Sequence, residues 1–346
     1  MARSGTPRKF PIMTLRTSFA RLAAVLPLML IAACGGSEQA PTTGGSGASD
    51  ISETITLYTC VSDTTIQPVI EAFEDDNPGA TIDLFRAPTA DLNARVAGDV
   101  RSGGLQADVI WACDPLTMQD YVAQDLLGGW TPETEVAEEL RTEDYVGVAV
   151  LYMVAVSAEG VTPPESWSDL TGDAYADGVV VPDPGFAASA LGALGYFSQD
   201  PDFGIEYYQA LKDNGAVQVS APDDVTTGVA EGVYKAGITN ANSAYAAQNA
   251  GSPIEIVWPE PGAIAIYGPA ALAADAADSD TAKAFLTYIA SEEGQTVIAE
   301  AGSYPALEGV SGPTIPEDAS IVFPDWAALA DQKDDLLADY QQIFGA

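Results

Sequence analysis

The sequence predicts an α/β fold in which mostly parallel strands alternate with helices. Short strand patterns occur at residues 53–58, 81–85 and 107–111. Between them, apolar residues recur at helical spacing within residues 63–79 and again from residue 89. Strand, helix, strand, helix, strand in close succession is typical of a doubly wound parallel sheet.

The pattern changes after residue 145. Residues 145–157 (YVGVAVLYMVAVS) form a long β-rich run, which suits a strand that crosses between two lobes. Further strands are expected at 179–181, 217–219 and 235–238, and further helices at 186–197, 203–213, 225–231, 281–289, 293–299 and 326–344. We expect residues 254–258 and 263–267 to form a β pair that returns the chain to the first lobe.

Chain length also favours two lobes, because roughly 290 ordered residues exceed one small core. We assign residues 54–149 together with residues 263–346 to lobe 1. Residues 150–262 form lobe 2 in this assignment.

The N-terminal segment predicts export and lipid attachment. Five cationic residues and no acid precede Cys34, and the apolar run that ends there is too short to span a membrane. Its ending, Ile31-Ala32-Ala33-Cys34, resembles a bacterial lipobox, in which the cysteine becomes the lipid-modified first residue. We therefore expect a signal peptide at 1–33, then lipidated Cys34 and a flexible tether at 34–53, holding the protein on the outer face of the cell membrane. An ordinary secretory signal with an incidental Cys34 is the alternative.

Composition excludes several functional classes. The chain has 50 acidic and 13 basic residues, a formal net charge of −37, which opposes binding to nucleic acid. It contains no histidine, so catalytic triads that use histidine and zinc sites with imidazole ligands are excluded. The sequence has no nucleophile elbow, HExxH motif or Walker loop. We expect a binding protein and not an enzyme.

Cysteine usage points to one disulfide. With Cys34 assigned to lipid, Cys60 and Cys113 remain. An even pair in an oxidising exterior suggests that they are bridged.

Several segments resemble one family of transport proteins. They are LYTCVSDTTIQPVIEAFE from Leu57, FRAPTADLNARV from Phe85, ADVIWACDP from Ala107, VPDPGFAASALGAL from Val181 and IEIVWPEPGAIAIYGPAALA from Ile254. In order and spacing the chain resembles the extracellular substrate-binding lipoproteins of ABC importers, in the ferric-iron, phosphonate, thiamine and sugar-phosphate cluster. The resemblance implies a type II periplasmic-binding-protein fold, whose two lobes are mostly parallel sheets flanked by helices and joined by two crossing segments.

The resemblance also implies a role and partners. A monomer of this kind captures a small ligand between its lobes and delivers it to a membrane permease that works with a separate ATPase subunit. An extracellular sensor or adhesion lipoprotein that uses the same fold without transport is the alternative. No cofactor is expected, although a ferric ion is a possible transported ligand.

The candidate site follows from the fold that the resemblance implies. Ligands of open α/β sheets bind outside the carboxyl ends of the strands. The residues expected to bind the ligand are Cys60, Ser62, Asp63, Arg86, Thr89, Asp114, Asp183, Ser189, Asn242 and Tyr245. For Asp63, Thr89 and Ser189, ordinary helix-start chemistry is the alternative. A surface salt bridge is the alternative for Arg86.

Two ligand chemistries stay open at this point. Ferric-binding relatives often use tyrosines, and here Tyr245 and Asp114 are the candidate metal ligands, without a second adjacent tyrosine and without histidine. An anionic ligand would use Arg86, serine and threonine hydroxyls and helix N-termini. Cys60 and Cys113 follow strands that are neighbours in such sheets, so we expect a bridge at the cleft edge, with a thiolate metal pair as the alternative.

Overall fold

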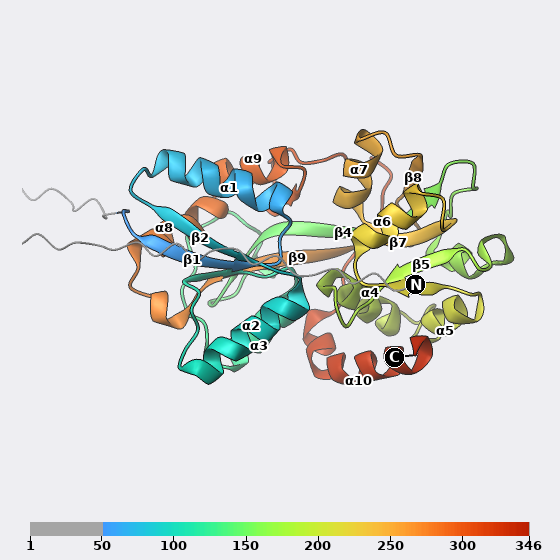
Figure 1. Ribbon diagram of the computed structural model, residues 1–346, viewed down its shortest axis with the longest axis horizontal. Coiled ribbons are helices and arrows are strands. Elements are labelled where there is room, and N and C mark those ends of the chain that lie inside the picture. The colour runs from blue at the N-terminus through green and yellow to red at the C-terminus, as the bar shows by residue number, and fades with distance from the viewer. Residues whose placement is uncertain (1–50, 346) are drawn as a thin grey trace, which may run out of the picture. The chain divides into compact units, whose positions relative to one another are not determined.

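Eleven strands form one hydrogen-bonded sheet in residues 51–345, the part of the chain that the computed structural model describes. The main path of the sheet runs β2-β1-β3-β9-β4-β7-β5-β6. Helices cover both faces, and the strands gather into two lobes that share the central strands β4 and β9 (Figure 1). The predicted two-lobed α/β fold is confirmed. The signal segment, Cys34 and most of the tether lie outside the described residues.

Lobe 1 begins with the predicted parallel strands. Strands β1 (Thr54–Thr59), β2 (Thr81–Arg86) and β3 (Val109–Trp111) are parallel, with β1 between the other two. The helices of this lobe are α1 (Asp63–Asp76), α2 (Thr89–Ser102), α3 (Pro115–Ala123), α8 (Asp280–Ile289) and α9 (Glu292–Glu300). The helical spacing in α1 buries Ile66, Val69, Ile70 and Phe73, as its periodicity predicts.

Two long strands connect the lobes. β4 (Val146–Ala158) and β9 (Ala263–Leu272) are antiparallel partners, and every residue of β9 is buried. β8 (Ile254–Val257) pairs with β4 and not with β9, so the expected pairing of residues 254–258 with 263–267 is wrong. β4 is long enough to pair with β9 along its first half and with β7 and β8 along its second.

Lobe 2 repeats the parallel arrangement. Its strands are β5 (Val179–Pro182), β6 (Val217–Val219) and β7 (Ala236–Asn240), with β5 parallel to both neighbours. Its helices are α4 (Ala188–Gln199), α5 (Glu206–Asp213), α6 (Pro222–Ala230) and α7 (Ala241–Asn249). Short elements complete the fold: β10 (Tyr304–Pro305), β11 (Ile321–Val322) and 3₁₀ turns at Glu138–Leu140, Trp167–Thr171, Asp173–Tyr175 and Ala274–Ala276.

Helices α3 and α7 were not expected. α7 buries only alanines, Ala241 and Ala244, so its sequence carries little hydrophobic periodicity. α3 begins at Asp114 and Pro115, an N-cap followed by proline at the first helical position. That pair is a local start signal that periodicity alone does not capture.

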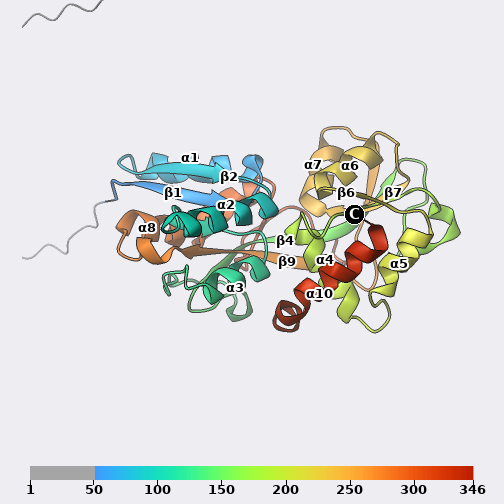
Figure 2. The ribbon, with the colours of Figure 1, turned by 60° about the horizontal axis from the view of Figure 1, so that its bottom comes forward.

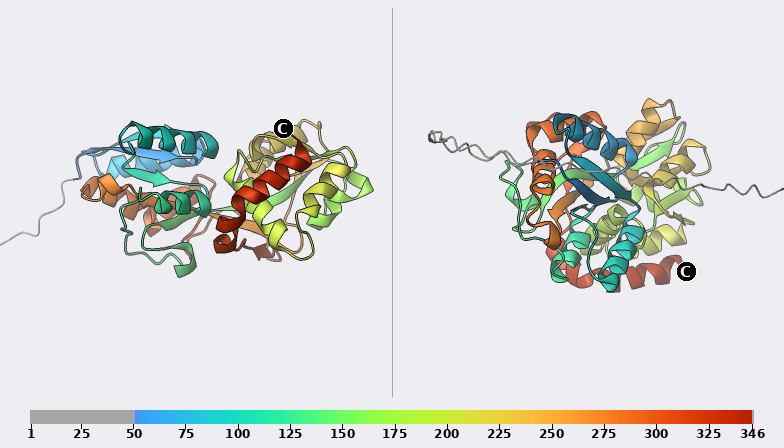
Figure 3. Two further views of the ribbon diagram at one scale, coloured as in Figure 1. Left: turned by 90° about the horizontal axis from the view of Figure 1, so that it is seen from below. Right: turned by 60° about the vertical axis from the view of Figure 1, so that its left-hand side comes forward.

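The C-terminal helix α10 (Trp326–Phe344) packs mainly on lobe 2, against α4 and α5, and also contacts α3 (Figures 2 and 3). Its side chains Leu329, Tyr340 and Phe344 are buried in a core cluster with lobe 2 residues. Gly195 of α4 makes this possible, because a Cβ there would collide with the Leu329 side chain. The predicted lobe boundaries placed this helix in lobe 1, whereas its contacts are mostly with lobe 2. Among residues 51–345, no helix is both long and apolar enough to cross a membrane.

We expect Leu329→Ala to lower the free energy of unfolding by about 2–5 kcal/mol, because it leaves a cavity in a fully buried contact. Urea unfolding followed by circular dichroism measures the change. Val233→Ala, at a position that is 64% exposed, should change the free energy by less than about 0.5 kcal/mol. Equal effects of the two substitutions would contradict the proposed packing of α10.

Candidate ligand-binding cleft

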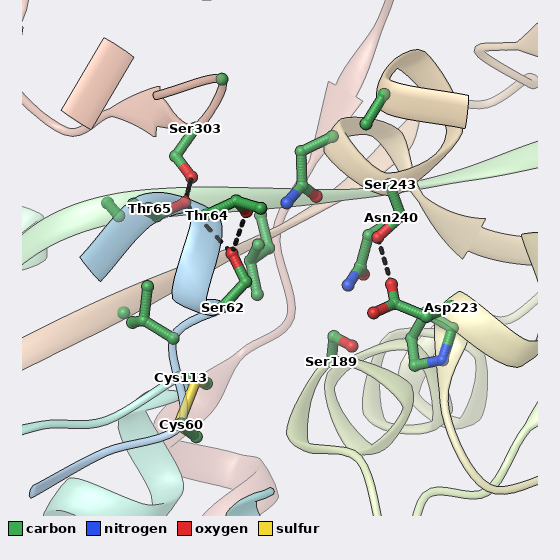
Figure 4. A pocket seen from close by; sticks show the side chains of 18 of the residues that line it. Cys60, Ser62, Thr64, Thr65, Cys113, Ser189, Asp223, Asn240, Ser243 and Ser303 are labelled. Carbon is green, nitrogen blue, oxygen red and sulfur yellow. Dashed lines mark hydrogen bonds between the residues drawn. A yellow bond between two sulfur atoms is a disulfide. The ribbon is translucent and has the colours of Figure 1, made fainter. Parts of the chain in front are cut away.

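A cavity of about 850 Å³ opens between the lobes, within the size range of small-molecule sites. On the lobe 1 side it is lined by the loops that follow β1, β2 and β3, and on the lobe 2 side by the first turns of α4, α6 and α7 (Figure 4). The carboxyl ends of the parallel strands therefore face this cavity, as the fold rule requires.

The cavity brings together eight of the ten predicted ligand-binding residues. They are Cys60, Ser62, Asp63, Arg86, Thr89, Ser189, Asn242 and Tyr245. Asp114 and Asp183 do not line it.

Helix N-termini converge on this cavity. α1 and α2 begin at Asp63 and Thr89, and the first turns of α4, α6 and α7 contribute Ser189, Asp223 and Asn242. A helix N-terminus presents unpaired N–H groups and a partial positive charge, so it favours an anion. None of Asp63, Thr89 and Ser189 is an N-cap, since those positions in α1, α2 and α4 are Ser62, Pro88 and Ala187. All three lie in the first turn of their helices, so ordinary helix-start chemistry stays the alternative to ligand binding.

Arg86 is held at the cleft by a backbone contact. Its Nε donates to the carbonyl of Val61 at 3.0 Å. The two ion pairs found within residues 51–345 are Arg95–Asp99 and Lys333–Asp120, so the surface salt bridge considered for Arg86 is not formed there. The remaining guanidinium N–H groups can donate to a ligand, in the planar geometry that suits phosphate or carboxylate.

Cys60 and Cys113 form a disulfide in the cleft wall, with a Cα–Cα distance of 6.0 Å. The bond joins the loops after β1 and β3, which are adjacent strands. The predicted bridge is confirmed. It ties down the loop that carries Val61, the hydrogen-bond acceptor of Arg86.

The cavity also contains polar residues that were not predicted from the sequence. In lobe 1, the hydroxyls of Thr65 and Ser303 are 2.7 Å apart. In lobe 2, Ser243 donates to the Asp223 carboxylate, and Asn240 lies nearby on the cleft wall (Figure 4). Asn240 is the last residue of β7. The rule that ligands bind at the carboxyl ends of parallel strands therefore could have predicted it. No such signal distinguishes Asp223 from the many other acids of the chain.

Asp114 has a structural position. It is the N-cap of α3, where its Oδ1 accepts the Thr117 N–H at 2.8 Å. The residue is 1% exposed, its Oδ2 has no hydrogen-bond partner within residues 51–345, and burial raises the pKa of its carboxyl above the ordinary value. Asp114 lines a separate cavity of about 110 Å³ together with Lys333.

Asp183 and the predicted metal pair, Tyr245 and Asp114, lie in different places in the structure. Asp183 accepts the Gly185 N–H at 2.8 Å in the loop before α4. Tyr245 lines the main cleft and accepts a hydrogen bond from the Trp258 indole, so it does not share a cavity with Asp114. Within the described part of the chain, no group of three or more His, Cys, Asp or Glu side chains is placed to hold a metal ion.

We expect Asp114→Asn to become increasingly stabilising relative to wild type as the pH rises from 4 to 8. The raised pKa means that folded Asp114 binds its proton more tightly than the unfolded chain, so ionisation at higher pH opposes folding. Asparagine keeps the cap without the charge. Urea unfolding of both proteins across this range measures the difference, and a difference that does not change with pH would contradict the assignment.

Known proteins share this fold and sequence pattern. Residues 55–303 match the family model described as bacterial extracellular solute-binding protein. Spermidine/putrescine-binding periplasmic proteins of Salmonella typhimurium and Escherichia coli are 25% identical over 183 residues, 50% of this chain, and the chain spans 52% of their length.

Solved structures agree at the level of the fold. AfuA from Actinobacillus pleuropneumoniae, with bound fructose-6-phosphate, has a TM-score of 0.74 at 17% identity, covering 84% of this chain and 98% of its own. Iron-bound HitA from Pseudomonas aeruginosa has a TM-score of 0.72 at 18% identity, covering 83% and 99%. The family model covers most of the two-lobed fold, and that fold encloses a cleft of a size that suits a small solute. The chain therefore belongs to the bacterial extracellular solute-binding protein family.

Proposed function

We propose that this protein is the receptor of an ABC importer for a small organic anion with a phosphate-like or phosphonate-like group. One observation carries the proposal: Arg86 and several helix N-termini line the same cavity. Arg86 has no ion-pair partner in residues 51–345. Serine and threonine hydroxyls on both walls add donors to the same space. All these groups favour negative charge.

Capture would proceed by closure of the lobes about β4 and β9, the two strands that connect them. A ligand that contacts both walls binds the closed form better and therefore shifts the protein toward it. The closed form would then dock on a membrane permease, with ATP hydrolysed by a separate subunit. A sensor that uses the same closure would bind its ligand equally well but would not support uptake.

A bare ferric ion suits this cleft less well. Tyr245 is the one tyrosine among the residues that line it, the chain has no histidine, and carboxylates on the walls do not form a three-ligand group within the described residues. Iron binding would therefore need a chelator or a synergistic anion to complete the coordination.

A polyamine is the second candidate ligand. The cleft contains the carboxylates of Asp63, Asp223 and Glu300, which would pair with ammonium groups. The curated relatives from Salmonella and Escherichia coli are named for spermidine and putrescine binding. A thermal-shift screen with sugar phosphates, alkylphosphonates, ferric citrate and spermidine separates these candidates, because a ligand in excess of its dissociation constant raises the melting temperature. Stabilisation by spermidine alone would reject the anion proposal.

We expect Arg86→Ala to weaken binding of the anionic ligand found in that screen by about 10- to 100-fold, since it removes a charged hydrogen-bond donor. Arg86→Lys should recover only part of the affinity, because lysine lacks the planar fork. Arg101→Ala is the matched control, at an exposed arginine on α2 outside the cleft. Isothermal titration calorimetry measures all three, and equal affinity of Arg86→Ala and wild type would remove Arg86 from the site.

We further propose that Cys34 carries the lipid that anchors the receptor. Cys34→Ser should release the protein from the membrane fraction into the medium, because the mature chain then lacks its acyl chains. Fractionation and intact mass measurement of the exported protein check this. A wild-type exported protein whose intact mass shows Cys34 without acyl chains would contradict lipidation at this residue.

A further inference from the structure

The cleft has a cationic side chain on its lobe 1 wall and a carboxylate on its lobe 2 wall. Arg86 lies on the lobe 1 wall and Asp223 on the lobe 2 wall, and both line the same cavity. Asp223 is in the first turn of α6, and its carboxylate accepts a hydrogen bond from the hydroxyl of Ser243 in the first turn of α7 (Figure 4). Neither ion pair found in residues 51–345 includes Asp223.

Asp223 and its neighbour Asp224 have different roles in the structure. Asp224 accepts the Ala221 N–H at 3.2 Å and so caps α6, and it does not line the cleft. Asp224 therefore caps the helix, whereas the adjacent Asp223 lines the cleft. Capping does not account for Asp223.

The chemistry of a carboxylate restricts what can bind beside it. An ionised carboxylate only accepts hydrogen bonds, and it has about four acceptor positions. Ser243 uses one of them. An oxyanion without protons, such as sulfate, has nothing to donate and would meet like charge. A ligand with an ammonium or hydroxyl group would instead fill the remaining acceptor positions.

The other two acids that line the cleft lie on the lobe 1 side. Asp63 begins α1 and Glu300 ends α9, so both belong to the lobe 1 side together with Arg86. Asp223 is the carboxylate that lobe 2 contributes to the cavity. A ligand whose anionic group binds Arg86 would meet Asp223 with the part that contacts the lobe 2 wall.

We propose that Asp223, oriented by Ser243, determines specificity by selecting solutes that carry an ammonium or hydroxyl group at the end opposite their anionic group. This inference rests on the proposed function, because the anionic group is the one assigned to Arg86. It adds that the receptor discriminates against anions that lack a hydrogen-bond donor.

Three phosphonates of equal chain length test the inference: 3-aminopropylphosphonate, 3-hydroxypropylphosphonate and propylphosphonate. Calorimetric titration of wild type should give roughly tenfold or tighter binding of at least one donor-bearing compound over propylphosphonate, as expected for a hydrogen bond to a charged group. Asp223→Asn should remove most of that preference, and mainly for the amine. Ser243→Ala keeps the charge but frees the carboxylate, so it should reduce the preference less.

The controls separate this inference from the proposed function. Glu231→Gln removes a carboxylate at the end of the same helix, outside the cleft, and should keep the wild-type preference. Arg86→Ala should weaken the binding of all three phosphonates. Equal binding of the three by wild type, with loss on Arg86→Ala, would overturn the role of Asp223 and leave the anion site intact. Binding of none by wild type would count against the anion site and the inference together.

Discussion

The antiparallel pairing of β4 with β9 is the constraint on which the rest of the structure depends. Their register runs from Val146 opposite Ala270 to Met153 opposite Ile264, and nearly all of their side chains are buried. One end of the pair extends the parallel strands of lobe 1 through β3, and the other end extends those of lobe 2 through β7. The two lobes thus share one hydrogen-bonded ladder.

This shared ladder also decides where chemistry can occur. In each lobe, the parallel strands end toward the other lobe, and the helices that follow begin there. The cleft therefore collects backbone N–H groups, which need no side-chain charge to attract an anion. That is an economical arrangement for a chain with 13 basic residues against 50 acidic ones. Arg86 and the disulfide Cys60–Cys113 then strengthen the lobe 1 wall through Val61, which connects them.

Strong acidity changes how individual carboxylates must be interpreted. Asp114, which the sequence made a candidate ligand, is a buried helix cap, whereas Asp223 faces the cleft and Asp224 caps α6. Each environment gives the same group a different role: solvation is removed at Asp114, whereas a hydroxyl donor orients Asp223.

The sequence by itself determined the alternation of strands and helices and the crossing strand at 145–157, because both depend on local periodicity. The cysteine pair followed from the cysteine count, and most of the lobe 1 wall followed from the strand ends of the fold that the resemblance implies. Only the tertiary structure decided the partner of β8, the packing of α10 on lobe 2 and the separation of Asp114 from Tyr245. These depend on contacts between residues far apart in the chain, such as Leu329 against Gly195. Local pattern carries no information about such contacts, since the same apolar helix face or acidic side chain fits several neighbours equally well.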